Sequence, residues 1–118
     1  MDAAVTLAAP HSGTYAALAM SAFGGSARQL LPGSAVMRRL GTRAPKGPRW
    51  VAYYSNLDLL IQPAASAKLD GAENHLVKDH GHVSLLLSPG VARSVTAVLD
   101  EQSTAAEPAA KAAPGRAA

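Results

Sequence analysis

The first hundred residues divide into short apolar runs separated by stretches rich in Gly, Pro, Ser and Asp. Three segments have the length and composition of strands: 3–9 (AAVTLAA), 50–55 (WVAYYS) and, more weakly, 73–78 (ENHLVK). The first is apolar throughout, which is typical of a strand buried on both faces of a parallel sheet, although its alanines would also suit a helix. The second is the clearest strand, because it is aromatic and β-branched and follows a proline.

Helices are predicted between the first two strands. The first covers residues 15–23, with Thr14 as its N-cap and a Gly-Gly pair at its end. Shorter helices are predicted over 26–31 and over 35–40, where Ser34 can serve as the cap. The basic segment that follows, GTRAPKGP, has the breaker content of a loop.

The last helix is predicted over residues 89–101. Ser88 can cap it, Pro89 suits its first turn, and four apolar residues recur on one face: Val91, Val95, Val98 and Leu99. Beyond this point Ala, Pro, Glu and Lys follow one another without periodicity. Residues 102–118 are therefore predicted to be a disordered Ala/Pro-rich tail.

The alternation of apolar strands with helices predicts the α/β class, with about three parallel strands and flanking helices in a domain over residues 1–101. A parallel sheet of only three strands leaves an apolar edge unpaired and one face poorly covered. Strand-like sequence also begins almost directly after Met1. We therefore expect the chain to be the C-terminal part of a larger domain.

Composition narrows the possibilities without assigning a function. A chain of 118 residues is too short for two domains, and a core of Ala, Val and Leu buries little area per residue. There is no Cys, which excludes disulfides and thiolate metal sites but does not assign a compartment. No stretch approaches the ~18 apolar residues of a membrane span, and the start lacks the basic region of a secretory signal.

The net charge is +3, and five of the eleven basic residues lie between residues 38 and 49. A basic stretch can bind nucleic acid, but such surfaces usually add interleaved aromatic residues or a recognisable reading motif. Neither accompanies this stretch. The basic residues are therefore predicted to be a solvated face, with no nucleic-acid partner.

Two polar residues directly after predicted strands are candidates for catalysis. Asp58 ends the segment Ser55-Asn56-Leu57-Asp58 after the second strand, and His82 lies in Gly81-His82-Val83-Ser84 after the third. An imidazole that shuttles a proton and a carboxylate that holds its tautomer are two of the three residues of a Ser–His–Asp triad, and in the α/β-hydrolase order the acid precedes the histidine. The third is missing, because no G-x-S-x-G segment occurs.

Each candidate has a simpler explanation. Asp58 could close an Asx turn at the end of a strand, and His82 could be an ordinary core or surface histidine. His80 is a weaker rival for the catalytic histidine, because no glycine precedes it. A metal cluster could also be read from His75, Asp79, His80 and His82, but no distant ligand group completes it.

Other residues are assigned structural roles. His11 is predicted to be hydrogen-bonded to the backbone, and none of Ser12, Ser26 and Ser34 has the strained strand–turn–helix setting of a nucleophile. Four apolar residues of the first helix could line an acyl pocket, but at this spacing a role in the helix core is the stronger expectation: Tyr15, Leu18, Met20 and Phe23.

At this point the sequence resembles a known family. Residues 6–14 (TLAAPHSGT) resemble the T-L-x-[TA]-P-H-x-G-T segment of α/β-hydrolase-fold lipases and esterases, above all bacterial class 2 lipases and relatives of the GPI inositol-deacylase group. In that family a variable lid or cap follows, which residues 15–48 would match. The family's [ST]-x-x-D segment then places its catalytic Asp at Asp58, and its G-H-x-x-L segment places the catalytic His at His82.

The resemblance covers about residues 3–99 and implies a partial α/β-hydrolase fold. It implies a carboxylic ester hydrolase that acts on an ester or lipid substrate without a cofactor or metal. The family's oxyanion loop and G-H-S-x-G elbow would precede Ala3, so the chain alone is expected to be inactive and to need the missing N-terminal half of the fold. The alternative is a non-catalytic truncated remnant or interaction module.

Overall fold

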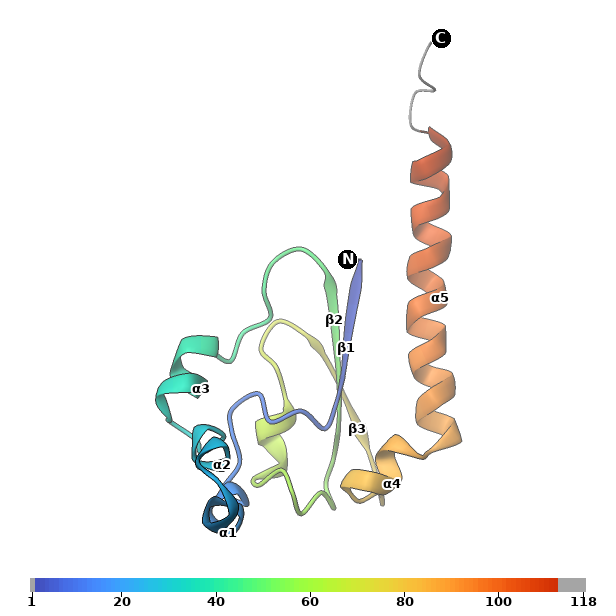
Figure 1. Cartoon of the computed structure of the whole chain (residues 1–118). Coiled ribbons are helices and arrows are strands. Elements are labelled where there is room, and N and C mark those ends of the chain that lie inside the picture. The colour runs from blue at the N-terminus through green and yellow to red at the C-terminus, as the bar shows by residue number, and fades with distance from the viewer. Residues whose placement is uncertain (1, 113–118) are drawn as a thin grey trace.

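In the computed structural model, three parallel strands form one sheet with helices on both sides (Figure 1). The structure describes residues 2–112, and the side chains of residues 2–103. The strands are β1 (Ala3–Leu7), β2 (Arg49–Ser55) and β3 (Glu73–Val77), in the order β1-β2-β3. The predicted α/β class and the three parallel strands are thus confirmed.

The strand boundaries follow the local backbone. β1 stops at Leu7, two residues before the predicted end, because Ala8 has a positive φ of 49°. The N–H of Ala8 still donates to the carbonyl of Tyr53, at 2.8 Å. β2 has a neighbour on both sides, and its middle residues are therefore buried: Val51, Ala52 and Tyr53.

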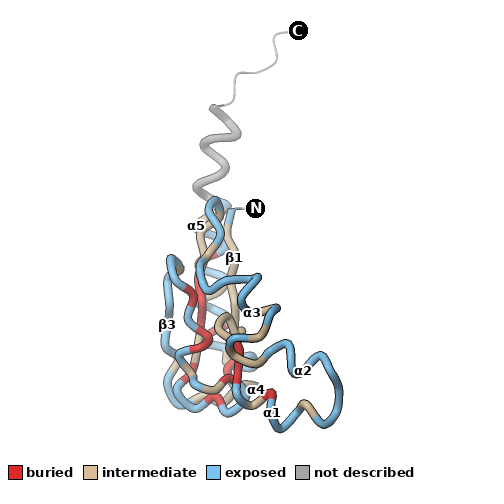
Figure 2. Tube along the Cα trace, turned by 90° about the vertical axis from the view of Figure 1, so that its left-hand side faces the viewer, coloured by how far each residue is buried: buried red, intermediate tan, exposed pale blue. Residues whose placement is uncertain are grey.

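Different elements cover the two faces of the sheet. Helix α5 (Pro89–Ala112) packs on one face, around the buried side chains of Val51, Tyr53 and Val98. The other face is covered by the 3₁₀ helix η2 (Ala64–Ala67) and the turn before it, where Ala8, Ile61 and Ala67 are buried together against Tyr54. Figure 2 shows the buried residues gathered in the sheet and the turns at its end.

Arg49 ties the start of β2 to two other elements. Its Nε and Nη2 donate to the Glu73 carboxylate of β3 at 2.6 and 3.0 Å, and its Nη1 donates to Glu101 of α5 at 2.8 Å. The hydrogen bond from Arg49 lowers the pKa of the Glu73 carboxyl. Arg49 is one of the five basic residues between residues 38 and 49, and at the surface its guanidinium fork binds two carboxylates from different elements.

Four short helical segments lie between β1 and β2: α1 (Ala17–Met20), the 3₁₀ turn η1 (Ser21–Phe23), α2 (Gly25–Gln29) and α3 (Ala35–Leu40). The predicted cap of α3 is confirmed, since Ser34 Oγ accepts from the Met37 N–H at 3.2 Å. The expected helix-core role of the first helix is wrong. Its large apolar side chains are all more than half exposed: Tyr15, Leu18, Met20 and Phe23.

The C-terminal helices differ from the prediction in two ways. A short helix, α4 (His82–Leu86), precedes α5 and was not predicted as a separate element. α5 continues from Pro89 to Ala112, beyond the predicted end at residue 101, and residues 102–112 of the predicted tail are helical. The Ala, Glu, Gln and Lys residues of this stretch are good helix formers, which favours continuation of the helix even though Pro108 does not. Residues 113–118 of that tail lie outside the described part.

The two outer edges of the sheet have different chemistry. Within residues 2–112 no strand pairs with the outer edge of β1 or of β3. β3 carries exposed polar side chains, Glu73, Asn74 and His75, which discourage further pairing. β1 (AAVTL) has no charged residue, so its outer edge, here called the β1 edge, is the one suited to another strand. Among the described helices, none combines the length and hydropathy of a membrane span.

Candidate active site

Asp58 and His82 lie at the same end of the sheet. Asp58 follows β2 by three residues, and His82 is the first residue of α4, a few residues after β3. Because the strands are parallel, their carboxyl ends meet at one edge, which lies at the bottom of Figure 1 beside α4. The sheet topology therefore brings together two segments that are distant in sequence.

The two candidate side chains are in direct contact. His82 Nδ1 lies 2.7 Å from Asp58 Oδ2, a hydrogen-bond distance. The Asp58 side chain is 2% exposed, whereas that of His82 is 26% exposed. An ionised carboxylate can only accept, so in the neutral imidazole that faces it the proton is on Nδ1 and Nε2 keeps its lone pair. In the described part of the chain, no hydrogen bond occupies Nε2.

The other carboxylate oxygen of Asp58 is held by its own turn. Oδ1 accepts from the backbone N–H of Leu60 at 2.8 Å and of Ile61 at 3.0 Å. The strand-ending Asx turn predicted as the simpler explanation for Asp58 is present, and it uses one carboxylate oxygen while the other contacts the imidazole. With three hydrogen bonds, the buried carboxylate has a fixed orientation toward His82.

His82 is presented by a short loop fixed at several points. Ser55 Oγ donates to the carbonyl of His80, and Asn56 Oδ1 accepts from the Asp79 N–H at 3.3 Å. Both anchors come from the segment that ends in Asp58, so the acid turn and the histidine loop are tied together. Further along, the N–H of Gly81 donates to Ser84 Oγ at 2.8 Å and starts α4.

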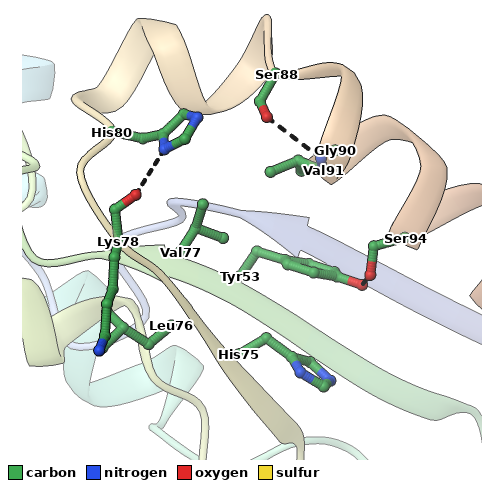
Figure 3. Close-up of a pocket in the computed structure, with 10 residues that line it drawn as sticks. All are labelled: Tyr53, His75, Leu76, Val77, Lys78, His80, Ser88, Gly90, Val91 and Ser94. Atoms are coloured by element: carbon green, nitrogen blue, oxygen red, sulfur yellow. Dashed lines mark hydrogen bonds between the residues drawn. The ribbon is translucent and has the colours of Figure 1, made fainter.

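The rival histidine is engaged elsewhere. His80 Nδ1 lies 2.7 Å from the backbone carbonyl of Lys78, as Figure 3 shows. His75 stacks on the ring of Tyr53, with the ring centroids 5.2 Å apart. Over the described residues, no three His, Cys, Asp or Glu side chains are grouped closely enough to hold a metal ion.

His11 lies in the P-H-S-G loop, in contact with β1. Its Nε2 is 2.9 Å from Thr6 Oγ1, so its partner is a side-chain hydroxyl, whereas a backbone group was expected. Partial burial lowers the pKa of the His11 imidazole, because desolvation disfavours the charged form. No hydrogen bond joins it to Asp58 or His82 within the described residues.

This burial predicts a pH dependence of stability. His11 has a lower pKa in the folded chain than its unfolded value of 6.5, so acidification below that value favours unfolding until the folded pKa is passed. We expect the free energy of unfolding of the wild type to fall between about pH 7 and about pH 5, and His11→Gln to remove part of that fall. Urea unfolding at both pH values measures the free energy of unfolding, with the exposed His75→Gln variant as the control. An equal fall of this free energy in all three proteins would contradict the assignment to His11.

Apolar side chains flank the Asp58–His82 pair on both sides. Leu57, Leu59 and Leu60 are exposed around the acid turn. Three exposed apolar residues at helical spacing follow His82 in the sequence: Val83 and Leu86 on α4, and Leu87 directly after it. These six side chains are here called the apolar rim. Exposed apolar residues that form one patch are typical of a surface that contacts a ligand or partner.

A pocket of about 440 Å³ lies between β3 and the start of α5 (Figure 3). Its walls include the stacked rings of Tyr53 and His75, and the hydroxyl of Tyr53 is hydrogen-bonded to Ser94 Oγ at 2.6 Å. Neither Asp58 nor His82 lines it. The pocket therefore lies on the face of the sheet that α5 covers, apart from the acid–base pair.

One residue near the site has a second role that the sequence did not indicate. Thr14 was assigned as the cap of a helix starting at residue 15, but α1 begins at Ala17. Thr14 Oγ1 accepts from the Ala16 N–H at 3.2 Å, as a cap does, and it also contacts the turn after Asp58, 2.8 Å from both the Leu60 carbonyl and the Gln62 N–H. Its place in the TLAAPHSGT motif was the only signal in the sequence that could have pointed to the site.

Comparisons with known proteins add no family assignment. No protein-family model matches the sequence, and no curated protein matches it. The case for a function therefore depends on the geometry of the site and on the short motifs around it.

Proposed function

We propose that the chain supplies the acid and the base of a Ser–His–Asp site in an α/β-hydrolase-fold lipase or esterase. The observation that carries the proposal is the 2.7 Å contact between His82 Nδ1 and the buried carboxylate of Asp58, at the carboxyl ends of adjacent parallel strands. The free Nε2 and the partial exposure of the imidazole suit a proton shuttle. The motif order along the chain agrees with that family.

The mechanism follows from these contacts. A serine hydroxyl attacks the ester carbonyl and gives its proton to His82 Nε2. The imidazolium is stabilised by the ionised Asp58, and it then protonates the departing alcohol as the tetrahedral intermediate collapses to an acyl-serine. Water repeats the sequence, with His82 as base, and releases the acid. This chemistry needs no cofactor.

The nucleophile in this proposal comes from a strand that pairs with the β1 edge. The hydroxyls nearest in sequence to the pair have other partners: Ser55 Oγ donates to the His80 carbonyl, and Ser84 Oγ accepts from Gly81. A parallel strand on the β1 edge would end at the same side of the sheet as Asp58 and His82. A serine directly after that strand would share their edge.

The apolar rim supports an ester substrate with an apolar acyl group. Leu59 and Leu87 are among its most exposed members and come from the two segments that carry Asp58 and His82. The exposed helices over residues 15–48 fit the lid or cap of such an enzyme. A non-catalytic interaction module is the competing function, and the same rim and β1 edge would serve it as contact surfaces.

The first test is activity of the chain alone. We expect no hydrolysis of a p-nitrophenyl ester above the His82→Ala background, because the chain lacks a nucleophile. Turnover that is abolished by His82→Ala would reveal a nucleophile within these residues. It would contradict the proposal that the nucleophile comes from another segment.

A second test adds the proposed nucleophile-bearing segment to this chain. An in-frame G-x-S-x-G upstream of the codon for Met1 would identify the segment, and its coexpression with this chain is expected to generate esterase activity. An assembled protein that binds but neither cleaves an ester nor reacts with a fluorophosphonate would support the interaction module instead.

A further inference from the structure

The turn that binds the Asp58 carboxylate is itself hydrogen-bonded to Thr14, a residue of the loop after β1. Thr14 is 4% exposed, and its Oγ1 donates to the Leu60 carbonyl at 2.8 Å and accepts from the Gln62 N–H at 2.8 Å. These two backbone groups lie on either side of Ile61. One buried hydroxyl thus clamps both ends of a three-residue stretch that is far away in sequence.

The same stretch carries the donors to the carboxylate. The N–H groups of Leu60 and Ile61 point at Asp58 Oδ1, and the side-chain amide of Gln62 donates to the Asp58 carbonyl. Residues 58–62 are therefore bound on one side to the catalytic acid and on the other to Thr14. A rotation of this backbone would move the donors that aim the carboxylate at His82.

Thr14 has its own fixed position. Its N–H donates to the Leu30 carbonyl at 2.7 Å, and the next N–H, that of Tyr15, donates to the Gln62 carbonyl at 2.8 Å. At Gly13, with φ of +83°, an added Cβ would lie 2.6 Å from the Leu30 oxygen, so only glycine permits this approach. The loop after β1 is thus locked between residues 30–32 and the acid turn.

We propose that Thr14 is a positioning residue for the Asp58–His82 pair. Its hydroxyl fixes the Leu60–Gln62 backbone, that backbone fixes the Asp58 carboxylate, and the carboxylate fixes the His82 tautomer. This inference rests on the proposed function for its catalytic meaning. Its structural content can be tested on the chain alone, without a nucleophile.

The test compares Thr14→Val, which keeps the side-chain shape but removes the hydroxyl, with Thr14→Ser, which keeps the hydroxyl. In ¹⁵N-labelled protein, NMR reports whether His82 carries its proton on Nδ1 and whether that proton has the downfield shift of a carboxylate hydrogen bond. We expect the downfield signal in the wild type and in Thr14→Ser, and its loss in Thr14→Val. An unchanged signal in Thr14→Val would overturn the proposal.

A matched control separates positioning from general destabilisation. Met37 is the buried residue of α3, and its thioether makes no hydrogen bond to the acid turn. Met37→Ala is therefore expected to lower stability while keeping the His82 signal. Loss of the signal in this control as well would overturn the specific role of Thr14.

If Thr14→Val does not fold, hydrogen exchange of the wild type decides. The clamp predicts that the amide protons of Leu60, Ile61 and Gln62 exchange at a common slow rate. The Gln62 amide donates its hydrogen bond to Thr14 Oγ1, so much faster exchange of this amide proton would overturn the clamp. Failure of the proposed function would look different, because the His82 signal would still depend on Thr14 while the assembled protein neither cleaved an ester nor reacted with a fluorophosphonate.

Discussion

In the proposed assembled hydrolase, replacing Asp58 by Asn is expected to lower kcat by about 10⁴-fold, with little change in KM. The contacts of Asp58 give the reason. The Leu60 and Ile61 N–H groups require an oxygen at the Oδ1 position, so the new amide nitrogen must take the Oδ2 position opposite His82 Nδ1. It can only donate there, so the imidazole proton moves to Nε2, which can then no longer accept a proton from serine.

The measurement is hydrolysis of a p-nitrophenyl ester by this chain together with the proposed nucleophile-bearing segment. Asp79→Asn is a matched control, because it makes the same chemical change at an exposed residue of the histidine loop with a positive φ of 61°, which Asn tolerates. We expect that variant to retain nearly full activity. Comparable kcat values for the two variants would remove Asp58 from the mechanism.

The second large effect concerns stability. Leu85 is 0% exposed, and it is the one buried residue of α4, the helix that begins at His82. Leu85→Ala is expected to lower the free energy of unfolding by about 3 kcal/mol, through lost burial and the cavity left behind. In a small domain this is a large part of the total, which is typically about 5–15 kcal/mol.

Leu87→Ala provides the control for that experiment. Leu87 lies just beyond the same helix and is 76% exposed, so its truncation is expected to change the free energy of unfolding by less than about 0.5 kcal/mol. Urea unfolding followed by circular dichroism measures both variants. Equal losses would mean that α4 does not anchor the histidine loop through Leu85.

Local signals explain why parts of the fold could be predicted. β2 was recognisable because an aromatic and β-branched run follows a proline, and α3 because a serine precedes it at the cap position. The meeting of Asp58 and His82 also followed from a simple rule, since parallel strands carry their carboxyl ends to one edge. None of these predictions required knowledge of distant contacts.

What the sequence missed depends on distant partners. The hydroxyl of Thr14 bonds to groups 46 and 48 residues away, and no local pattern distinguishes that role from a helix cap. The exposed state of Leu18 and Phe23 was missed for a related reason. Helical spacing identifies an apolar face, but it does not say whether another element covers that face.

The spacing of the strands along the chain also has a consequence for the order of folding. β2 and β3 are joined by a short connection, whereas the connection from β1 to β2 includes all the helices from α1 to α3. Closing a longer loop costs more chain entropy, so β2 and β3 are favoured to pair first. Asp58 and His82 belong to that early unit, and the acid–base contact can therefore form before β1 docks to complete the sheet.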